Sequence, residues 1–162
     1  MFRPAAFSQG FTLIELLIAT SISLLLVGGG IASFVTFNDK QGLIGAGKEL
    51  LSYIRSAQVK ARAAERPEDC IKLDGYSIQG FADSATIRLV AICDGGVEYE
   101  RSVYTLPSGT TSESDFDMMF LGLQGGVVGN EDVVLVSPSG DEYGISVSSS
   151  GEISDQGILP EQ

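Results

Sequence analysis

The sequence contains no histidine and no tryptophan, and only two of its 162 residues are cysteines. Without histidine, the chain lacks the side chain that most often serves as general base, as metal ligand and as a charge switch near neutral pH. No Ser–His or Cys–His pair can be assembled, and no GxSxG motif occurs. The glycine-rich stretches at 28–30 and 124–129 lack the P-loop lysine and the Rossmann spacing. These absences weigh against an enzyme, and we expect no catalytic residue.

Basic residues are scarce in the second part of the chain. Residues 1–72 hold eight Lys and Arg against six Asp and Glu, whereas residues 73–162 hold two against fifteen. The net charge of −11 is therefore concentrated after residue 72. An acidic domain repels phosphate backbones, so we expect no nucleic-acid partner. The same acidity is typical of an exported domain that must stay soluble.

Two acidic pairs, Asp115 with Asp117 and Glu131 with Asp132, are the only candidates for a metal site. Carboxylate oxygens are the ligands that calcium prefers, but the spacing of an EF-hand is absent. The alternative is that these acids are solvated residues of loops. We favour the alternative and expect no metal and no cofactor.

A long uncharged segment occupies residues 16–37. Its 22 residues would form a helix of about 33 Å, enough to cross the core of a bilayer. A buried helix that is apolar on every face does not suit so small a domain. A secretory signal would be followed by small residues at a cleavage site, but Asn38, Asp39 and Lys40 follow here. The segment is therefore expected to span a membrane.

The residues that lead into this segment are GFTLIELL, from Gly10 to Leu17. Glu15 places a carboxylate inside an apolar stretch, where an ionisable group is costly and is a functional candidate by default. The pattern closely resembles the leader of type IV pilins and type II secretion pseudopilins. That resemblance implies cleavage by a prepilin peptidase between Gly10 and Phe11 and N-methylation of Phe11. It also implies that Glu15 neutralises the terminal amine of a neighbouring subunit during assembly.

The resemblance further implies the partners and the location of the chain. Its partners would be prepilin peptidase, other pilins or pseudopilins that pack against the N-terminal helix, the inner-membrane assembly platform and membrane lipid. The protein would be a single-pass inner-membrane protein with an extracytoplasmic head, and would then pass into a filament.

Residues 38–66 have the pattern of an amphipathic helix. The residues of one face recur at steps of three and four, and basic and acidic side chains occupy the other. Pro67 ends the helix at or before Arg66. The buried face is expected to comprise Leu43, Gly47, Leu50, Ile54, Ala57, Ala61 and Ala64.

Residues 67–162 are expected to form a β-rich head. Short apolar runs predict strands at 70–73, 76–81, 85–93, 97–106, 117–123, 133–136 and 143–147. Asp74-Gly75 predicts a two-residue hairpin turn between the first two strands. Asp94-Gly95-Gly96 and 138–141 predict further turns, and the tail at 154–162 is expected to be loose.

Cys70 and Cys93 do not form a CxxC pair, and two thiols without histidine make no closed zinc site. A disulfide between them is expected if the head lies in an oxidising compartment. The alternative is a pair of reduced, buried cysteines.

Together these segments predict an α+β pilin fold. A cleaved leader occupies 1–10, the membrane-spanning half of a long helix 11–37, its amphipathic half 38–66, and an antiparallel β-sheet head 67–162. The layout of residues 55–63, 133–136 and 145–153 is similar to that of the H-type pseudopilins and related minor pilins. We interpret the chain as a minor pilin or pseudopilin that assembles into, or initiates, a type IV pilus or a secretion pseudopilus. The alternative is a binding module carried at a filament tip, for contact with a surface, a secreted substrate or DNA.

Overall fold

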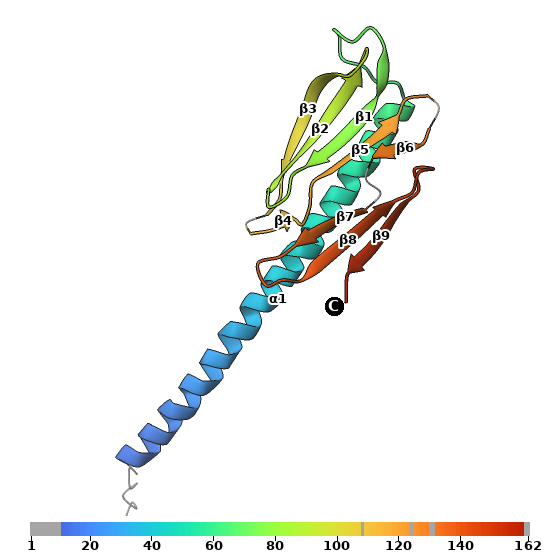
Figure 1. Cartoon of the computed structure of the whole chain (residues 1–162). Helices are drawn as coiled ribbons and strands as arrows, with labels where there is room; N and C mark the ends of the chain where they lie inside the picture. The colour runs from blue at the N-terminus through green and yellow to red at the C-terminus, as the bar shows by residue number, and fades with distance from the viewer. Residues whose placement is uncertain (1–10, 108, 124, 130–131, 161–162) are drawn as a thin grey trace, which may run out of the picture. The chain divides into compact units, whose positions relative to one another are not determined.

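The computed structural model describes residues 11–107, 109–123, 125–129 and 132–160 (Figure 1). Within these residues a single helix, α1, is followed by nine strands. The elements are α1 Leu13–Arg62, β1 Leu73–Gly80, β2 Thr86–Cys93, β3 Val97–Thr105, β4 Thr111–Ser112, β5 Phe116–Leu121, β6 Val127–Gly129, β7 Asp132–Val136, β8 Glu142–Val147 and β9 Ile153–Ile158.

The chain divides into two compact units, Met1–Phe37 and Asn38–Gln162, and α1 contributes to both. In the first unit, every side chain that the structure describes from residue 11 to 37 is exposed. The predicted uncharged segment is thus helical throughout its described residues.

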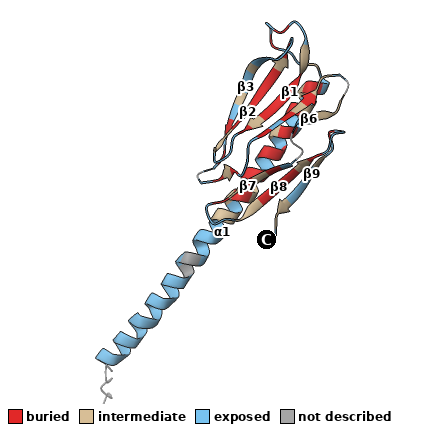
Figure 2. Ribbon diagram, viewed as in Figure 1, coloured by how far each residue is buried: buried red, intermediate tan, exposed pale blue. Residues whose placement is uncertain are grey.

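In the second unit, α1 buries one face against the sheets, as the spacing of its apolar residues predicts (Figure 2). Leu43, Leu50, Ile54, Ala57 and Ala61 are almost completely buried. They form a common core with residues of both sheets. Ala64 is only half-buried, because the helix has already ended at that point.

The C-terminus of α1 lies four residues before the latest end that Pro67 allows. The Glu65 N–H donates to Lys60 O at 3.1 Å and the Ala64 N–H donates to Ala61 O at 3.1 Å. Ala64 has a φ of 51°. This is the hydrogen-bond pattern of a Schellman motif, which caps the last carbonyls of the helix. Local capping therefore ends the helix before the proline is reached.

The strands form two antiparallel sheets, in the orders β3-β2-β1-β5-β6 and β4-β7-β8-β9. Strand residues alternate between the core and the opposite face. Tyr76 and Ile78 of β1, Met118 of β5, and Leu135 and Ile145 of the second sheet lie in the core. The predicted α+β architecture, one long N-terminal helix followed by antiparallel sheets, is confirmed.

The predicted hairpin at Asp74-Gly75 is wrong. Both residues lie within β1, where Gly75 is opposite Ile92 of β2 and Leu121 of β5. A bulge between Leu73 and Gly75 accommodates Asp74. A Cβ on Gly75 would overlap the backbone carbonyl of Phe120. The glycine therefore permits the close approach of a neighbouring strand, not a turn, and residues 70–72 are not a strand.

The prediction of a loose tail at 154–162 is also wrong. Residues Ile153–Ile158 form β9, which pairs antiparallel with β8. The Tyr143 hydroxyl donates to Asp155 Oδ1 at 2.6 Å. The Leu159 N–H donates to Glu142 O at 2.9 Å. The polar composition of this segment suits an edge strand whose side chains are largely exposed.

Candidate assembly segment

Helix α1 begins with a side-chain cap from Thr12. The Glu15 N–H donates to Thr12 Oγ1 at 3.3 Å, and the Leu16 N–H donates to Thr12 O at 3.2 Å. Thr12 and Glu15 have the spacing of a capping box, in which the N-cap hydroxyl satisfies an otherwise unpaired N–H of the first turn. Glu15 is thereby placed in the first turn of the helix, where a carboxylate is favoured by the helix dipole.

Phe11 lies just before the capped turn and is 84% exposed. Glu15 is also exposed. Gly10, the other side of the predicted cleavage site, lies outside the described residues. Phe11 and Glu15, the two described residues to which the motif assigns a role, are therefore both exposed near the start of α1.

The following turns of α1 form an apolar surface that no other described residue covers. Leu13 is 91% exposed and Leu25 77%, and a contiguous apolar surface of this length marks a site that contacts a protein or a membrane. Four hydroxyls in this segment, on Thr20, Ser21, Ser23 and Ser33, donate to carbonyls three or four residues earlier. Each of these polar groups is satisfied within the helix, as an apolar environment requires.

By length and composition α1 meets the requirements of a membrane-spanning helix, and the most apolar part of it has no buried surface. This uncovered helix and the leader in front of it fit a membrane-anchored protein.

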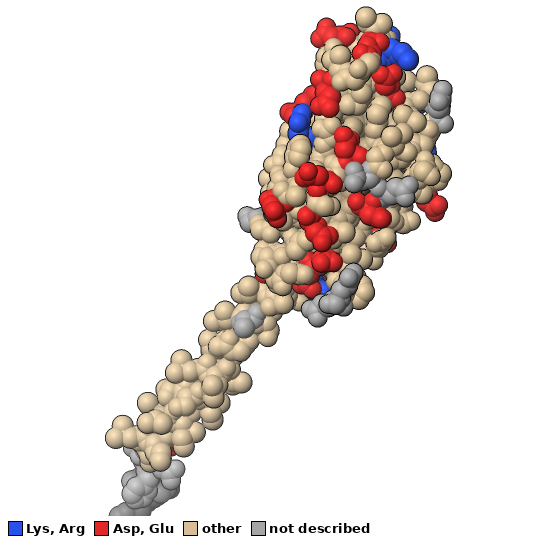
Figure 3. All heavy atoms as spheres, in the orientation of Figure 1, with Lys and Arg blue, Asp and Glu red and all other residues tan. Residues whose placement is uncertain are grey.

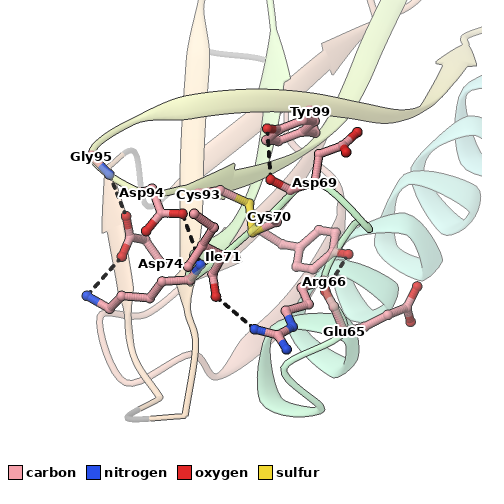
Figure 4. The surroundings of a disulfide bond; sticks show 12 residues. Glu65, Arg66, Asp69, Cys70, Ile71, Asp74, Cys93, Asp94, Gly95 and Tyr99 are labelled. Atoms are coloured by element: carbon pink, nitrogen blue, oxygen red, sulfur yellow. Dashed lines mark hydrogen bonds and ion pairs between the residues drawn. A yellow bond between two sulfur atoms is a disulfide. The ribbon is translucent and has the colours of Figure 1, made fainter.

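A disulfide joins Cys70 and Cys93, with a Cα–Cα distance of 5.7 Å (Figure 4). It links the segment after α1 to the end of β2. Both half-cystines are buried. The predicted disulfide is therefore present.

Hydrogen bonds reinforce the same region, and Lys72 Nζ lies 3.4 Å from Asp74 Oδ1 in an ion pair. Asp94 Oδ2 accepts from the Lys72 N–H at 3.0 Å, and Asp74 Oδ2 accepts from the Gly95 N–H at 3.3 Å. Arg66 Nη1 donates to Ile71 O at 2.7 Å (Figure 4). The connection between helix and sheet is thus fixed at several points.

Two tyrosines tie separate elements together through carboxylates, which the sequence did not reveal. Tyr104 of β3 donates to Glu49 Oε2 of α1 at 3.0 Å, and Tyr143 of β8 donates to Asp155 Oδ1 of β9. Burial, reinforced by these hydrogen bonds to carboxylates, raises the pKa of Tyr104 and that of Tyr143 to about 12. Both phenols are therefore held in the protonated, hydrogen-bond-donating form.

Acidic side chains dominate the face of the sheets that is turned to the viewer in Figure 3. Asp115 Oδ1 accepts from the Ala82 N–H at 2.7 Å, and Asp117 accepts from the Ser77 hydroxyl. Among the residues described, no group of three or more His, Cys, Asp or Glu side chains could hold a metal ion. Glu131, a member of the second acidic pair considered for calcium, lies outside the described residues.

Residues 6–31 match the family model of the prokaryotic N-terminal methylation motif. No curated protein and no solved structure gives a significant match to the chain. The matched stretch contains Phe11, the Thr12 cap, Glu15 and the first turns of the uncovered helix. This motif is the cleavage site read by prepilin peptidase. The chain thus carries, at residues 6–31, the N-terminal methylation motif that forms the leader of type IV pilins and pseudopilins.

Proposed function

We propose that this protein is a minor pilin or pseudopilin, a structural subunit that enters or initiates a type IV pilus or a type II secretion pseudopilus through α1. The observation that carries the proposal is the leader motif at the start of a helix whose apolar surface is covered by no other described residue. Lipid covers that surface before assembly, and the helices of neighbouring subunits cover it afterwards.

In this proposal prepilin peptidase cleaves between Gly10 and Phe11 and methylates Phe11. The new terminal amine is cationic, and Glu15 supplies an anion one helical turn away. A charge that finds its partner only on docking specifies the register of a subunit. The capped first turn supports this role, because Thr12 fixes the backbone on which Glu15 is carried.

The head is exported in this proposal, and the inner-membrane platform then moves the subunit into the filament. The disulfide between Cys70 and Cys93 supports export, because such bonds persist in oxidising compartments.

The test is to express the full chain with and without prepilin peptidase, to determine the mass of the mature protein, and to probe sheared filaments for it. We expect a mature chain that begins at N-methyl-Phe11 and is present in filaments. A mature chain that begins after residue 37 would identify an ordinary signal peptide and refute the proposal.

A further inference from the structure

Three cations form a stripe on the exposed side of α1. Lys48, Arg55 and Arg62 are each seven residues apart, so they lie on one face of the helix at intervals of about 10.5 Å. All three are exposed. In the part of the chain that the structure describes, none of them forms an ion pair. Val59 lies between the last two cations and is 62% exposed. We call Lys48, Arg55, Val59 and Arg62 the cationic stripe.

A groove crosses the outer face of the five-stranded sheet, the face that is turned away from α1. Tyr76 and Ile78 point into the core, so Ser77 and Gln79 of the same strand point away from α1. Two adjoining hollows of about 380 and 410 Å³ share Gln79, Glu98 and Asp117 in their walls. We call this combined feature the acidic groove.

The acidic groove has an apolar lining and a carboxylate at each side. Its apolar side chains include Phe81, Ile92, Met119 and Val128. The Gln79 amide nitrogen lies 3.2 Å from Glu98 Oε1 and 3.4 Å from Asp117 Oδ2, so the two carboxylates flank a single donor.

The groove contains one basic residue, and that residue is already paired. Arg88 Nε lies 2.9 Å from Glu100 Oε2. In contrast, Glu98 and Asp115 form no ion pair with any described residue. Glu98 and Asp115 therefore present negative charge beside an apolar lining, which suits a cationic partner that also carries an apolar side chain.

We propose that the acidic groove of one subunit receives the cationic stripe of a second copy of this chain. The guanidinium of Arg55 supplies several donors for the carboxylates that flank Gln79, and Val59 covers apolar lining of the groove. The stripe and the groove are different surfaces of the same unit, so the contact is head-to-tail. Such a contact leaves one stripe and one groove free, so it can repeat from subunit to subunit along a filament unless the rotation closes it into a ring. This inference rests on the proposed role as a filament subunit, and assigns the contact between heads.

Zero-length cross-linking of the full chain in its native membranes tests the contact directly. A carbodiimide joins a lysine amine to a carboxylate only where the two touch. We expect a cross-linked dimer in which a peptide containing Lys48 is joined to one containing Glu98, Asp115 or Asp117. The variant Arg55→Lys keeps the charge and adds an amine at the centre of the stripe, and we expect a new cross-link from position 55. Both products should be lost at about 1 M salt, where the Debye length is about 3 Å.

Charge reversal tests whether the partner is the same chain. Arg55→Glu and Glu98→Lys should each lower entry into sheared filaments about tenfold, because like charges would face one another. The double variant Arg55→Glu with Glu98→Lys should restore entry. Lys72→Glu is the matched control for Arg55→Glu. It makes the same change in net charge at an exposed lysine that lies outside both the cationic stripe and the acidic groove, and it should have little effect on entry into filaments.

Three results would overturn the inference. The first is wild-type entry by both single variants, together with cross-links that never join α1 to the groove residues. The second is a defect in each single variant that the double variant does not repair, which would identify a different pilin as the occupant. The third is a Lys48 cross-link to an unrelated protein. Failure of the wild-type chain to be cleaved or to enter any filament would instead refute the proposed function. The cross-linking experiment distinguishes failure of the proposed function from failure of this inference, because it needs no filament.

Discussion

Gly47 of α1 lies against the ring of Tyr143 of β8, so closely that a Cβ at position 47 would overlap the ring. Gly47→Ala should therefore force the two elements apart. Overpacking of this kind costs about 1–3 kcal/mol, of which the better helix propensity of alanine recovers up to about 1 kcal/mol. We expect a net loss of up to about 2 kcal/mol in the free energy of unfolding, measured by urea titration of the full chain in detergent.

Gly45 provides the matched control for this substitution. It lies on the same helix, is exposed, and a Cβ there would meet nothing within 4 Å. Gly45→Ala should raise the free energy of unfolding by about 0.5–1 kcal/mol, because alanine loses less backbone entropy. Equal effects of the two substitutions would show that the contact between Gly47 and Tyr143 does not limit the packing of α1.

Removal of the Cys70–Cys93 disulfide should destabilise the head. The bond closes a sequence separation of 23 residues, for which the chain-entropy model gives about 3 kcal/mol. We expect the double variant Cys70→Ala with Cys93→Ala to lose about this amount in urea titration, and reduction of the wild-type protein to have a comparable effect. If non-reducing mass mapping of native protein found free thiols, the bond would not be part of the functional state.

The two tyrosines that donate to carboxylates, Tyr104 and Tyr143, predict a loss of stability at high pH. The pKa of Tyr104 and that of Tyr143 rise from 10.0 to about 12 in the folded chain. Their stabilising effect is fully present below pH 10, and between pH 10 and about 12 the unfolded chain releases these protons first. The free energy of unfolding should therefore fall as the pH rises through this window.

Tyr143→Phe tests the origin of that dependence. It removes one phenol that binds its proton more tightly in the folded than in the unfolded chain. The fall in the free energy of unfolding between pH 10 and about 12 should therefore become less steep. The measurement is urea titration at a series of pH values, with phenolate absorbance followed in parallel. An unchanged slope would mean that burial and the hydrogen bond to Asp155 do not raise the pKa of Tyr143 in the folded chain.

Glu15→Ala should block assembly without preventing processing. The variant helix should insert into the membrane at least as readily, because a carboxylate has been removed from its apolar segment. Cleavage should be normal, since the Gly10–Phe11 junction is unchanged. A partner's terminal amine would be left unpaired, and the loss of one member of a buried pair costs about 3–5 kcal/mol.

The expected phenotype of Glu15→Ala is therefore normal abundance, a normal mature mass and absence from sheared filaments. Glu15→Gln should be similarly defective, because an uncharged amide of the same shape cannot neutralise an amine. Wild-type entry of Glu15→Ala along the whole filament would contradict the charge-pairing role. Entry at the tip alone, detected by immunogold labelling, would place this subunit where no neighbour's amine needs the carboxylate.

The helix and most strands could be predicted because their apolar periodicity is strong. Burial of one face leaves a direct pattern in the sequence. In the helix this pattern is the spacing of buried residues from Leu43 to Ala61, and in β8 it is the alternation of Tyr143, Ile145 and Val147 with their neighbours. The predicted disulfide was likewise found. Strands β4 and β6 were missed because two and three residues are too short to show any period.

The wrong predictions come from residues whose conformation is decided by contacts distant in sequence. Asp74-Gly75 has the composition of a turn, but pairing with β2 and β5 on both sides holds it extended. Residues Ile153–Ile158 are polar, yet they pair along β8 and receive the Tyr143 hydrogen bond. The capping of α1 by Thr12 was also overlooked, although the Thr12–Glu15 spacing is a recognisable signal.

The pairing of β9 with β8 sets an order of events during synthesis. Strand β8 is an inner strand of its sheet only once β9 has been made. Asp155, which accepts a hydrogen bond from the Tyr143 hydroxyl, is translated after Tyr143. Until residue 158 is free of the ribosome and of any translocation channel, the edge of β8 is unpaired and open to other strands. The apolar part of α1, which is long enough to cross a membrane, is translated long before that moment. Any anchoring of the nascent chain by this part of α1 would therefore come before its second sheet is complete.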